Sequence, residues 1–585
     1  MTIPNHSVLR ALLLFLFLEA ASYVNAYPDR NPKIRVEKRF SEEEKSTKCR
    51  CFPGDACWPT QEEWNALNQS VDGRLVATVP IGSVCHGSTT YNAEKCANLK
   101  AAWNVPETHT DTSSSVLAPF FANQSCDPFL PRDSQCVIGT YVQYAIDVAN
   151  ISHIQRALSF AKKKNLRLVI RNTGHDYFGK STGAGALSVW THHLKSFDLV
   201  DFTSPSYTGK AIKVGSGIQG GEILPLAFKQ GYAIVAGVCP TVGPAGGFTQ
   251  GGGLGPLTSK HGFGADQVLE WQVVLTDGNF VTATPEKYTD LYWALSGGGG
   301  GAYGVVYSVT IKAHPNELTT AANLTFANSG ASDSFFEGVK AFTAVVPSLT
   351  DLGGTALWTV RSGAFSLAPA TAPGVSKKTI DALFEPVLKK LEGLNITYSY
   401  SSTEFRSYYE SYLAYNPPAS TPGIQIGGRL LPRSVITGNI DGLIETIRSI
   451  VGYGAAVTGV AYKAPSTPGV PNAVNPELRN SLVSLQVGTL WNTTDWAANI
   501  KNQNLITNTL VPSLAKLIPG GGSAYLNQAD FREPKWQQTF YGVNYNTLLC
   551  TKNKYDPDGI FWGNTVVGSE KWKETDDKRL CRVSS

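Results

Sequence analysis

Apolar and polar positions in the middle of the chain follow two periodicities, one typical of helices and one typical of strands. Residues 151–164 (ISHIQRALSFAKKK) place apolar side chains at helical spacing and end on lysines, which favours a helix. The turn residues 276–279 separate two strand-like runs, a pattern typical of a hairpin. The predicted strands of this block are 166–170, 211–214, 233–236, 268–275, 280–284 and 304–313. Together they predict an α+β domain from about residue 136 to residue 315.

After residue 315 the apolar pattern changes to longer helices between strands. The predicted helices are 335–346, 378–394 and 441–451, and the predicted strands are 318–326, 356–360, 396–400 and 457–462. This order is typical of helices packed on one face of an antiparallel sheet. A Pro-rich loop follows at 463–476, and the tail from about residue 525 is aromatic and polar.

Composition narrows the class of protein. The chain has 585 residues, a formal net charge of +4 and 16% charged residues, below the roughly 25% of an average globular domain. These values exclude a disordered acidic chain and a coiled coil. Because the charge gives no basic stripe, nucleic acid is not an expected partner. The length predicts two or more domains, each with its own core.

The first residues predict export. Arg10 precedes the apolar run 11–18, which is too short to span a bilayer, and residues 24–26 (VNA) offer a cleavage site. We therefore expect a signal peptide at 1–26, a secreted protein, and no membrane span. Lys38-Arg39 is either a dibasic processing site or part of a solvated charged stretch. Sequons that fit glycosylated surface loops occur at Asn68, Asn123, Asn150, Asn323, Asn395 and Asn492.

The ten cysteines are unevenly distributed. Seven lie between residues 49 and 136, two more are Cys550 and Cys581, and Cys239 stands alone in the middle. The first group predicts an N-terminal extension held by disulfides. Cys239 is either a residue with a chemical role or a buried or distantly paired cysteine.

A first glycine-containing loop, residues 171–181 (RNTGHDYFGKS), follows directly on the strand 166–170. Its glycines permit close approach of backbone to a ligand, and successive N–H groups in such a loop suit pyrophosphate oxygens. His175 could act as a base, bind a metal or carry a covalent cofactor. No second ligand stands at a spacing characteristic of zinc sites, so we expect no metal.

Two further glycine-rich segments follow. Residues 237–255 (GVCPTVGPAGGFTQGGGLG) include Cys239, and residues 290–304 lead through a run of glycines into a predicted strand. Neither segment has the Walker ending or the Rossmann spacing of glycines. So much glycine costs backbone entropy, which makes sense where backbone lies against a ligand, although a flexible loop is the alternative.

These three segments, in this order, resemble the flavin domain of the berberine-bridge-enzyme-like oxidoreductases of the vanillyl-alcohol oxidase superfamily. The tail residues 541–546 (YGVNYN) and 552–557 (KNKYDP) look like that family's C-terminal flavin-contacting segment. Residues 49–59 (CRCFPGDACWP) are similar to the start of secreted fungal oxidases related to isoamyl alcohol oxidase.

The resemblance implies FAD, bound covalently through His175 to the 8α-methyl group and through Cys239 to C6. It implies that the other cofactor-binding residues are Arg171, Thr173, Gly174, Asp176, Gly179, Ser181, Gly243, Gly246, Gly247, Gly251, Gly252, Gly255, Asn544 and Tyr545. Tyr545 is also the first candidate for the catalytic base, the alternative being a packing aromatic beside the ring.

The resemblance also implies the domain organisation and the activity. The expected parts are a signal peptide (1–26), a disulfide-stapled extension (27–130), a PCMH-type FAD-binding domain (131–315), a substrate domain (316–524) and a berberine-bridge-like segment returning to the FAD (525–585). The expected activity is oxidation of an alcohol, or dehydrogenation of a natural product, in fungal secondary metabolism, with O2 as acceptor and H2O2 as product. We expect a monomer whose partners are a small-molecule substrate and O2. Two alternatives are a carbohydrate oxidase on the same scaffold and a non-catalytic secreted glycoprotein.

Overall fold

The computed structural model describes residues 49–87, 89–327, 332–416, 419–421, 423–465 and 469–583. The expected signal peptide and Lys38-Arg39 lie outside these residues. No described helix has the length and apolar character needed to cross a membrane.

The first part of the fold is a four-stranded sheet in the order β1–β2–β4–β3. Its strands are β1 (Leu75–Ala77), β2 (Tyr144–Asp147), β3 (Leu168–Arg171) and β4 (Leu187–Trp190). β2, β4 and β3 run parallel, and β1 adds antiparallel to β2. The predicted helix forms as α6 (Ile151–Lys163) and buries Ile154, Ala157 and Leu158. Because β1 belongs to this sheet, the described part of the N-terminal extension, from residue 49 on, contributes a strand to the fold.

The second part is a five-stranded antiparallel sheet in the order β5–β6–β10–β8–β9. Its strands are β5 (Phe197–Ser204), β6 (Tyr207–Gly215), β8 (Val268–Val274), β9 (Phe280–Ala283) and β10 (Val305–Lys312). The pairing of β8 with β9 confirms the predicted hairpin. The helices α7 (Gly220–Lys229) and α9 (Thr289–Leu295) contribute buried residues to the same core.

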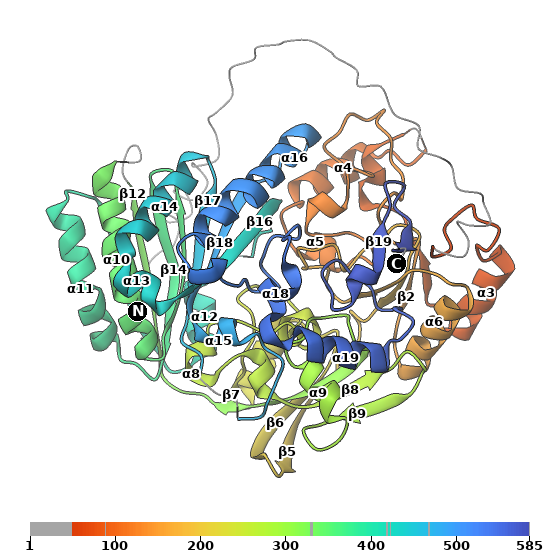
Figure 1. Cartoon of the computed structure of the whole chain (residues 1–585), viewed down its shortest axis with the longest axis horizontal. Helices are drawn as coiled ribbons and strands as arrows, with labels where there is room; N and C mark the ends of the chain where they lie inside the picture. The colour runs from red at the N-terminus through yellow and green to blue at the C-terminus, as the bar shows by residue number, and fades with distance from the viewer. Residues whose placement is uncertain are drawn as a thin grey trace. The chain divides into compact units, whose positions relative to one another are not determined.

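The third part is a seven-stranded antiparallel sheet in the order β15–β12–β14–β13–β17–β18–β16. Its strands are β12 (Thr319–Ala327), β13 (Thr355–Arg361), β14 (Ala364–Pro373), β15 (Tyr398–Phe405), β16 (Ile424–Pro432), β17 (Ala456–Ala461) and β18 (Ser481–Leu490). The three predicted helices form as α10 (Asp333–Asp351), α11 (Lys377–Gly393) and α14 (Ile440–Gly452). They cover one side of this sheet (Figure 1), as the sequence predicts, which confirms the α+β class.

The two faces of this sheet have different neighbours because successive side chains point to opposite sides of a strand. In β13, Trp358 and Val360 are buried in the core formed with the helices. Leu357, which comes directly before Trp358, faces a cavity instead, as do Thr458 of β17 and Gln486 of β18. The sheet therefore has one core face and one cavity face.

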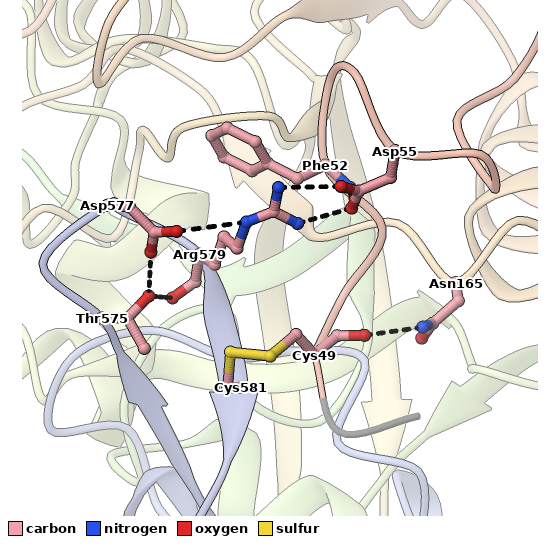
Figure 2. The surroundings of a disulfide bond; sticks show 8 residues. All are labelled: Cys49, Phe52, Asp55, Asn165, Thr575, Asp577, Arg579 and Cys581. Atoms are coloured by element: carbon pink, nitrogen blue, oxygen red, sulfur yellow. Dashed lines mark hydrogen bonds and ion pairs between the residues drawn. A yellow bond between two sulfur atoms is a disulfide. The ribbon is translucent and has the colours of Figure 1, made fainter. Parts of the chain in front are cut away.

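The beginning and the end of the described chain are joined. Figure 2 shows the disulfide between Cys49 and Cys581, which are 532 residues apart in sequence. Beside it, the Arg579 guanidinium bonds both carboxylate oxygens of Asp55 at 2.5 and 2.8 Å. The Cys49 carbonyl accepts a bond from Asn165 Nδ2 at 3.0 Å. The C-terminal hairpin β19 (Trp572–Glu574) and β20 (Leu580–Arg582) is thereby held against the segment that follows α6.

The remaining cysteines pair locally or not at all. The disulfides are Cys51–Cys57, Cys85–Cys96 and Cys126–Cys136. Cys239 and Cys550 are free thiols. Thus Cys239 is neither paired locally nor used in a distant disulfide.

The sequons lie in different settings. Asn123, Asn150, Asn395 and Asn492 are exposed, whereas Asn68 is half-buried in α3 (Gln61–Ser70). The prediction of a surface loop is wrong for Asn323. This residue lies in β12, between the partner strands β14 and β15, and its side-chain oxygen is buried. The strand pairing on both sides leaves this asparagine little access.

Candidate active site

A cavity of about 450 Å³ lies where the three glycine-containing segments meet the cavity face of the seven-stranded sheet. Of the residues predicted to bind the cofactor, those that line it are Thr173, Gly174, His175, Asp176, Ser181, Cys239, Gly243, Gly246, Gly247 and Gly255. Gly300 and Gly301, from the third segment, line it too. The structure thus brings together segments that are more than 100 residues apart in sequence.

The loop after β3 is shaped by Asp176. Its carboxylate accepts the backbone N–H groups of Phe178, Lys180 and Ser181 at 2.8 to 2.9 Å. Gly174 has φ +80°, a backbone conformation that side-chain-bearing residues rarely adopt. These constraints fold the chain tightly after β3 and place His175 in the cavity wall.

His175 and Cys239 lie close together in this wall of the cavity. Cys239 Sγ is 3.9 Å from His175 Nε2, and Thr241 Oγ1 lies 2.6 Å from the same nitrogen. Burial, with the nearby positive charge of Arg171, lowers the pKa of His175 to about 4. The imidazole is therefore neutral at ordinary pH, so one ring nitrogen keeps a lone pair for bonding. The free thiol of Cys239 and the neutral imidazole of His175 are therefore close enough for both to contact the same ring system of a bound ligand.

Arg171 lies behind the loop and not in the cavity lining. Its buried guanidinium donates from Nη2 to the His109 carbonyl at 3.1 Å, and a Cβ at Gly174 would stand 2.6 Å from it. Burial lowers the pKa of Arg171 to about 10, so it remains charged at neutral pH. The guanidinium therefore packs against the backbone of the loop at Gly174. Gly179, Gly251 and Gly252 also lie outside the lining, and Gly179 packs on the ring of Phe121.

Two observations test whether the cavity suits FAD. The buried atoms Asn172 Oδ1, Ser216 Oγ and Gln250 Oε1 have no hydrogen-bond partner among the described residues, and all three residues line the cavity. A Cβ added at Gly247 or Gly301 would meet no atom within 4 Å, so open space lies directly against this backbone. A ligand rich in donors and acceptors, lying along the glycines, would satisfy these atoms. The residues present fit a dinucleotide cofactor.

Tyr545 and Asn544 are placed elsewhere. Tyr545 begins α19 (Tyr545–Tyr555), and its hydroxyl donates to the Glu570 carboxylate at 2.7 Å. The buried setting and Glu570 raise the pKa of Tyr545. Asn544 Nδ2 donates to the carbonyls of Ala473 and Val474. Neither residue lines the cavity, so the prediction of Tyr545 as the base is corrected: its hydroxyl is committed to Glu570.

The substrate-domain side of the cavity was missed by sequence reasoning. It includes Leu357, Thr458 and Gln486 from the sheet, and Tyr525 and Gln528 from the tail. Side chains alternate between the two faces of β13 and β17, so the sequence could have predicted which of their residues face the cavity. That prediction requires knowing first which face of the sheet packs on the helices.

Two stacked histidines outside the cavity lining, His261 and His314, predict a pH dependence of stability. The rings of His261 and His314 are 3.7 Å apart at 15°, and burial is the main cause that lowers their pKa values, to about 4 and about 3. The folded protein keeps both neutral while the unfolded chain takes up protons below about pH 6.5. Stability should therefore fall as pH drops from 6.5 to 4, by up to about 1.4 kcal/mol per pH unit for each histidine.

Urea unfolding at pH 7.5, 6, 5 and 4 measures this slope. The variant His314→Gln should unfold with a shallower pH dependence below pH 6.5, and with the wild-type dependence between pH 7 and 8. Parallel curves for the two proteins down to pH 4 would contradict the prediction.

Comparison with known proteins agrees with this cavity. A family profile for the FAD binding domain matches residues 142–284, and a berberine and berberine-like profile matches residues 524–567. The FAD-linked oxidoreductase sor8 of Hypocrea jecorina is 64% identical over 540 residues, which cover 92% of this chain and 94% of that protein. The crystal structure of the VAO-type flavoprotein MtVAO615 from Myceliophthora thermophila C1 matches with TM-score 0.87 and 38% identity. It covers 92% of this chain and 100% of that one.

More distant structures share the fold alone. Glucooligosaccharide oxidase from Acremonium strictum matches with TM-score 0.61 and 19% identity, over 73% of this chain and 92% of that one. The fold and the cavity define a flavoprotein of the FAD-binding class. The chain belongs to the berberine-bridge-enzyme-like FAD-linked oxidoreductases of the vanillyl-alcohol oxidase superfamily.

Proposed function

We propose that this protein is a secreted FAD oxidase that converts an alcohol to a carbonyl, or dehydrogenates a natural product, and transfers the electrons to O2 to give H2O2. The bound FAD would supply the hydride acceptor and the site of reoxidation. The net reaction for an alcohol is R2CHOH + O2 → R2CO + H2O2. The observation that carries the proposal is the pair formed by His175 and Cys239, 3.9 Å apart in the cavity wall.

We further propose that both residues bond the flavin covalently. The neutral His175 ring and the unpaired Cys239 thiol support this, since neither group is committed to an ion pair or a disulfide. The glucooligosaccharide oxidase of Acremonium strictum has a 6-S-cysteinyl, 8α-N1-histidyl FAD. In this chain the Asp176 loop and the glycines at 246–247 would hold the cofactor. Two covalent attachments would keep it from dissociating outside the cell.

Disulfides support the proposed secretion. Four disulfides form within the described residues, which is typical of oxidising compartments. Exposed sequons such as Asn123 and Asn395 would accept glycans on the way.

Spectroscopy and a peptide map test the proposal. The secreted protein should keep its visible flavin absorbance in the pellet after acid precipitation. Digestion should give one yellow species in which the His175 and Cys239 peptides are joined through a single flavin. A Cys239 peptide that alkylates freely would overturn the second attachment, and a colourless pellet would overturn both. Peroxide release on a panel of alcohols and sugars then separates an alcohol oxidase from a carbohydrate oxidase.

A further inference from the structure

The described lining on the substrate side of the cavity is uncharged, and its polar side chains include two glutamines, Gln486 and Gln528. Among the described lining residues, the carboxylate and the ammonium group belong to Asp176 and Lys180, both on the loop after β3. The seven-stranded sheet contributes side chains such as Leu357, Thr458 and Val460. A charged substrate group entering here would lose water and meet no opposite charge, at a large cost in free energy. The wall therefore selects against ionised substrates.

The two glutamines come from different parts of the fold and are hydrogen-bonded to each other. Gln486, on β18, donates from Nε2 to Gln528 Oε1 at 2.8 Å. Both residues are partly exposed and both line the cavity. Within the described chain, the second carbonyl, Gln486 Oε1, accepts no bond, and the second amide group, Gln528 Nε2, donates none. The bond that joins the amides leaves one acceptor and one donor available.

The position of Gln528 is fixed next to the glycines. Its neighbour Asn527 donates from Nδ2 to the Gly247 carbonyl at 3.0 Å, and a Cβ at Gly251 would collide with the same amide at 2.4 Å. The tail thus brings the glutamine pair to the edge of the segment that would hold the cofactor. A substrate atom bound to the pair would lie beside that segment.

We propose that Gln486 and Gln528 select neutral alcohols and orient the hydroxyl that reacts. A hydroxyl both accepts and donates one hydrogen bond, which matches the available Gln528 NH2 group and the available Gln486 carbonyl. The substrate class is a neutral molecule that presents a hydroxyl at the cofactor side and apolar surface to Leu357 and Val460. This inference rests on the proposed function, because it assigns the substrate wall of the same site.

The test uses matched probes of one shape and three charges. These are 4-methylbenzyl alcohol, 4-(hydroxymethyl)benzoate and 4-(aminomethyl)benzyl alcohol, titrated into the holoenzyme and followed by the change in flavin absorbance. The neutral probe should bind at least about tenfold more tightly than either ionised probe, since a charge that loses its water and meets no opposite charge costs more than that factor. Equal or tighter binding of an ionised probe, or no binding of the neutral probe, would overturn the proposal.

Variants locate the selectivity. Gln528→Glu replaces the donor by an anion, so it should weaken binding of the neutral probe about tenfold and make the ammonium probe the preferred one. Gln528→Met keeps the volume without the hydrogen bonds and should weaken the neutral probe without gaining the ammonium probe. Gln538→Glu, an exposed position in α18 (Trp536–Tyr541), should behave like the wild type. Unchanged preferences in both Gln528 variants would overturn the assignment.

The two proposals fail in different ways. A protein that carries no flavin contradicts the proposed function before any titration. A protein with full flavin absorbance but no preference for the neutral probe contradicts only the role of the glutamine pair.

Discussion

Replacing Lys552 by methionine is expected to lower the free energy of unfolding by about 3–5 kcal/mol, the cost of removing one partner of a buried ion pair. Lys552 lies in α19, and Asp556 lies one turn later, directly after the end of this helix. Both side chains are almost completely buried. The ammonium group donates to Asp556 Oδ2 at 2.7 Å, and to the carbonyls of Ala302 at 2.7 Å and Phe561 at 2.6 Å. Methionine would leave the carboxylate and both carbonyls without their shared donor.

This cluster connects the tail to the cofactor cavity. Ala302 belongs to the third glycine segment, and Phe561 lines the cavity. Leu168 of β3 forms a parallel bridge with Phe561, so the tail also touches the strand that leads to His175. Loss of Lys552 should therefore reduce flavin content along with stability. The fraction of chains that carry flavin, measured by the ratio of visible to ultraviolet absorbance, gives that second readout.

The matched control is Lys554→Met, in the same helix. Lys554 is exposed and pairs with Asp290 at the surface, at 2.6 Å. Exposed ion pairs contribute about 0–1 kcal/mol, so this variant should keep its flavin and unfold near the wild-type urea midpoint. Equal losses in both variants would show that the buried cluster has no special role. The double variant Lys552→Met/Asp556→Asn should recover part of the loss, since it no longer buries an unpaired charge.

Local signals in the sequence predicted the elements whose apolar pattern is clear. The hairpin of β8 and β9 and the helices α6, α10, α11 and α14 fall close to their predicted ranges. The strand β14 was missed because it contains Pro369 and Pro373, which argue against a strand. The strand β16 contains Gly427 and Gly428 and lacks the usual β-branched run. β14 forms because its two neighbours, β12 and β13, both supply hydrogen bonds, whereas β16 lies at the edge of the sheet and pairs with β18 alone.

Only the part of the candidate site formed by the glycine-containing loops could be predicted from the sequence. They located His175 and Cys239, which the fold brings within 3.9 Å. The direction of a side chain was beyond reach: Arg171 turns behind its loop, and Tyr545 turns to Glu570. Gln486 lies on a strand that was not predicted. The pairing of Cys49 with Cys581 has no local signal either, because spacing does not determine disulfide connectivity.

Replacing Asp176 by alanine should reduce the fraction of chains that carry covalent flavin at least tenfold, which corresponds to about 1.4 kcal/mol or more of lost loop stability. The carboxylate accepts the N–H groups of Phe178, Lys180 and Ser181, and charged hydrogen bonds contribute about 1.5–3 kcal/mol each before relaxation. Without them the loop has no internal acceptor for these three donors. His175 would then sample positions in which it no longer faces Cys239.

Two further variants separate this role from a general loss of stability. In Asp176→Asn, the amide oxygen can still accept from Phe178 and Lys180, but the amide nitrogen faces the Ser181 N–H, so we expect an intermediate flavin fraction. Asp277→Ala is the control. It removes an aspartate in the exposed β8–β9 turn, far from His175 in sequence, that accepts the Asn279 N–H. That variant should keep the wild-type flavin fraction, measured on the same peptide map. If Asp176→Ala retains full flavin while only its unfolding midpoint falls, the loop positions His175 by some other contact, and Thr241, 2.6 Å from its ring nitrogen, is the residue to replace next.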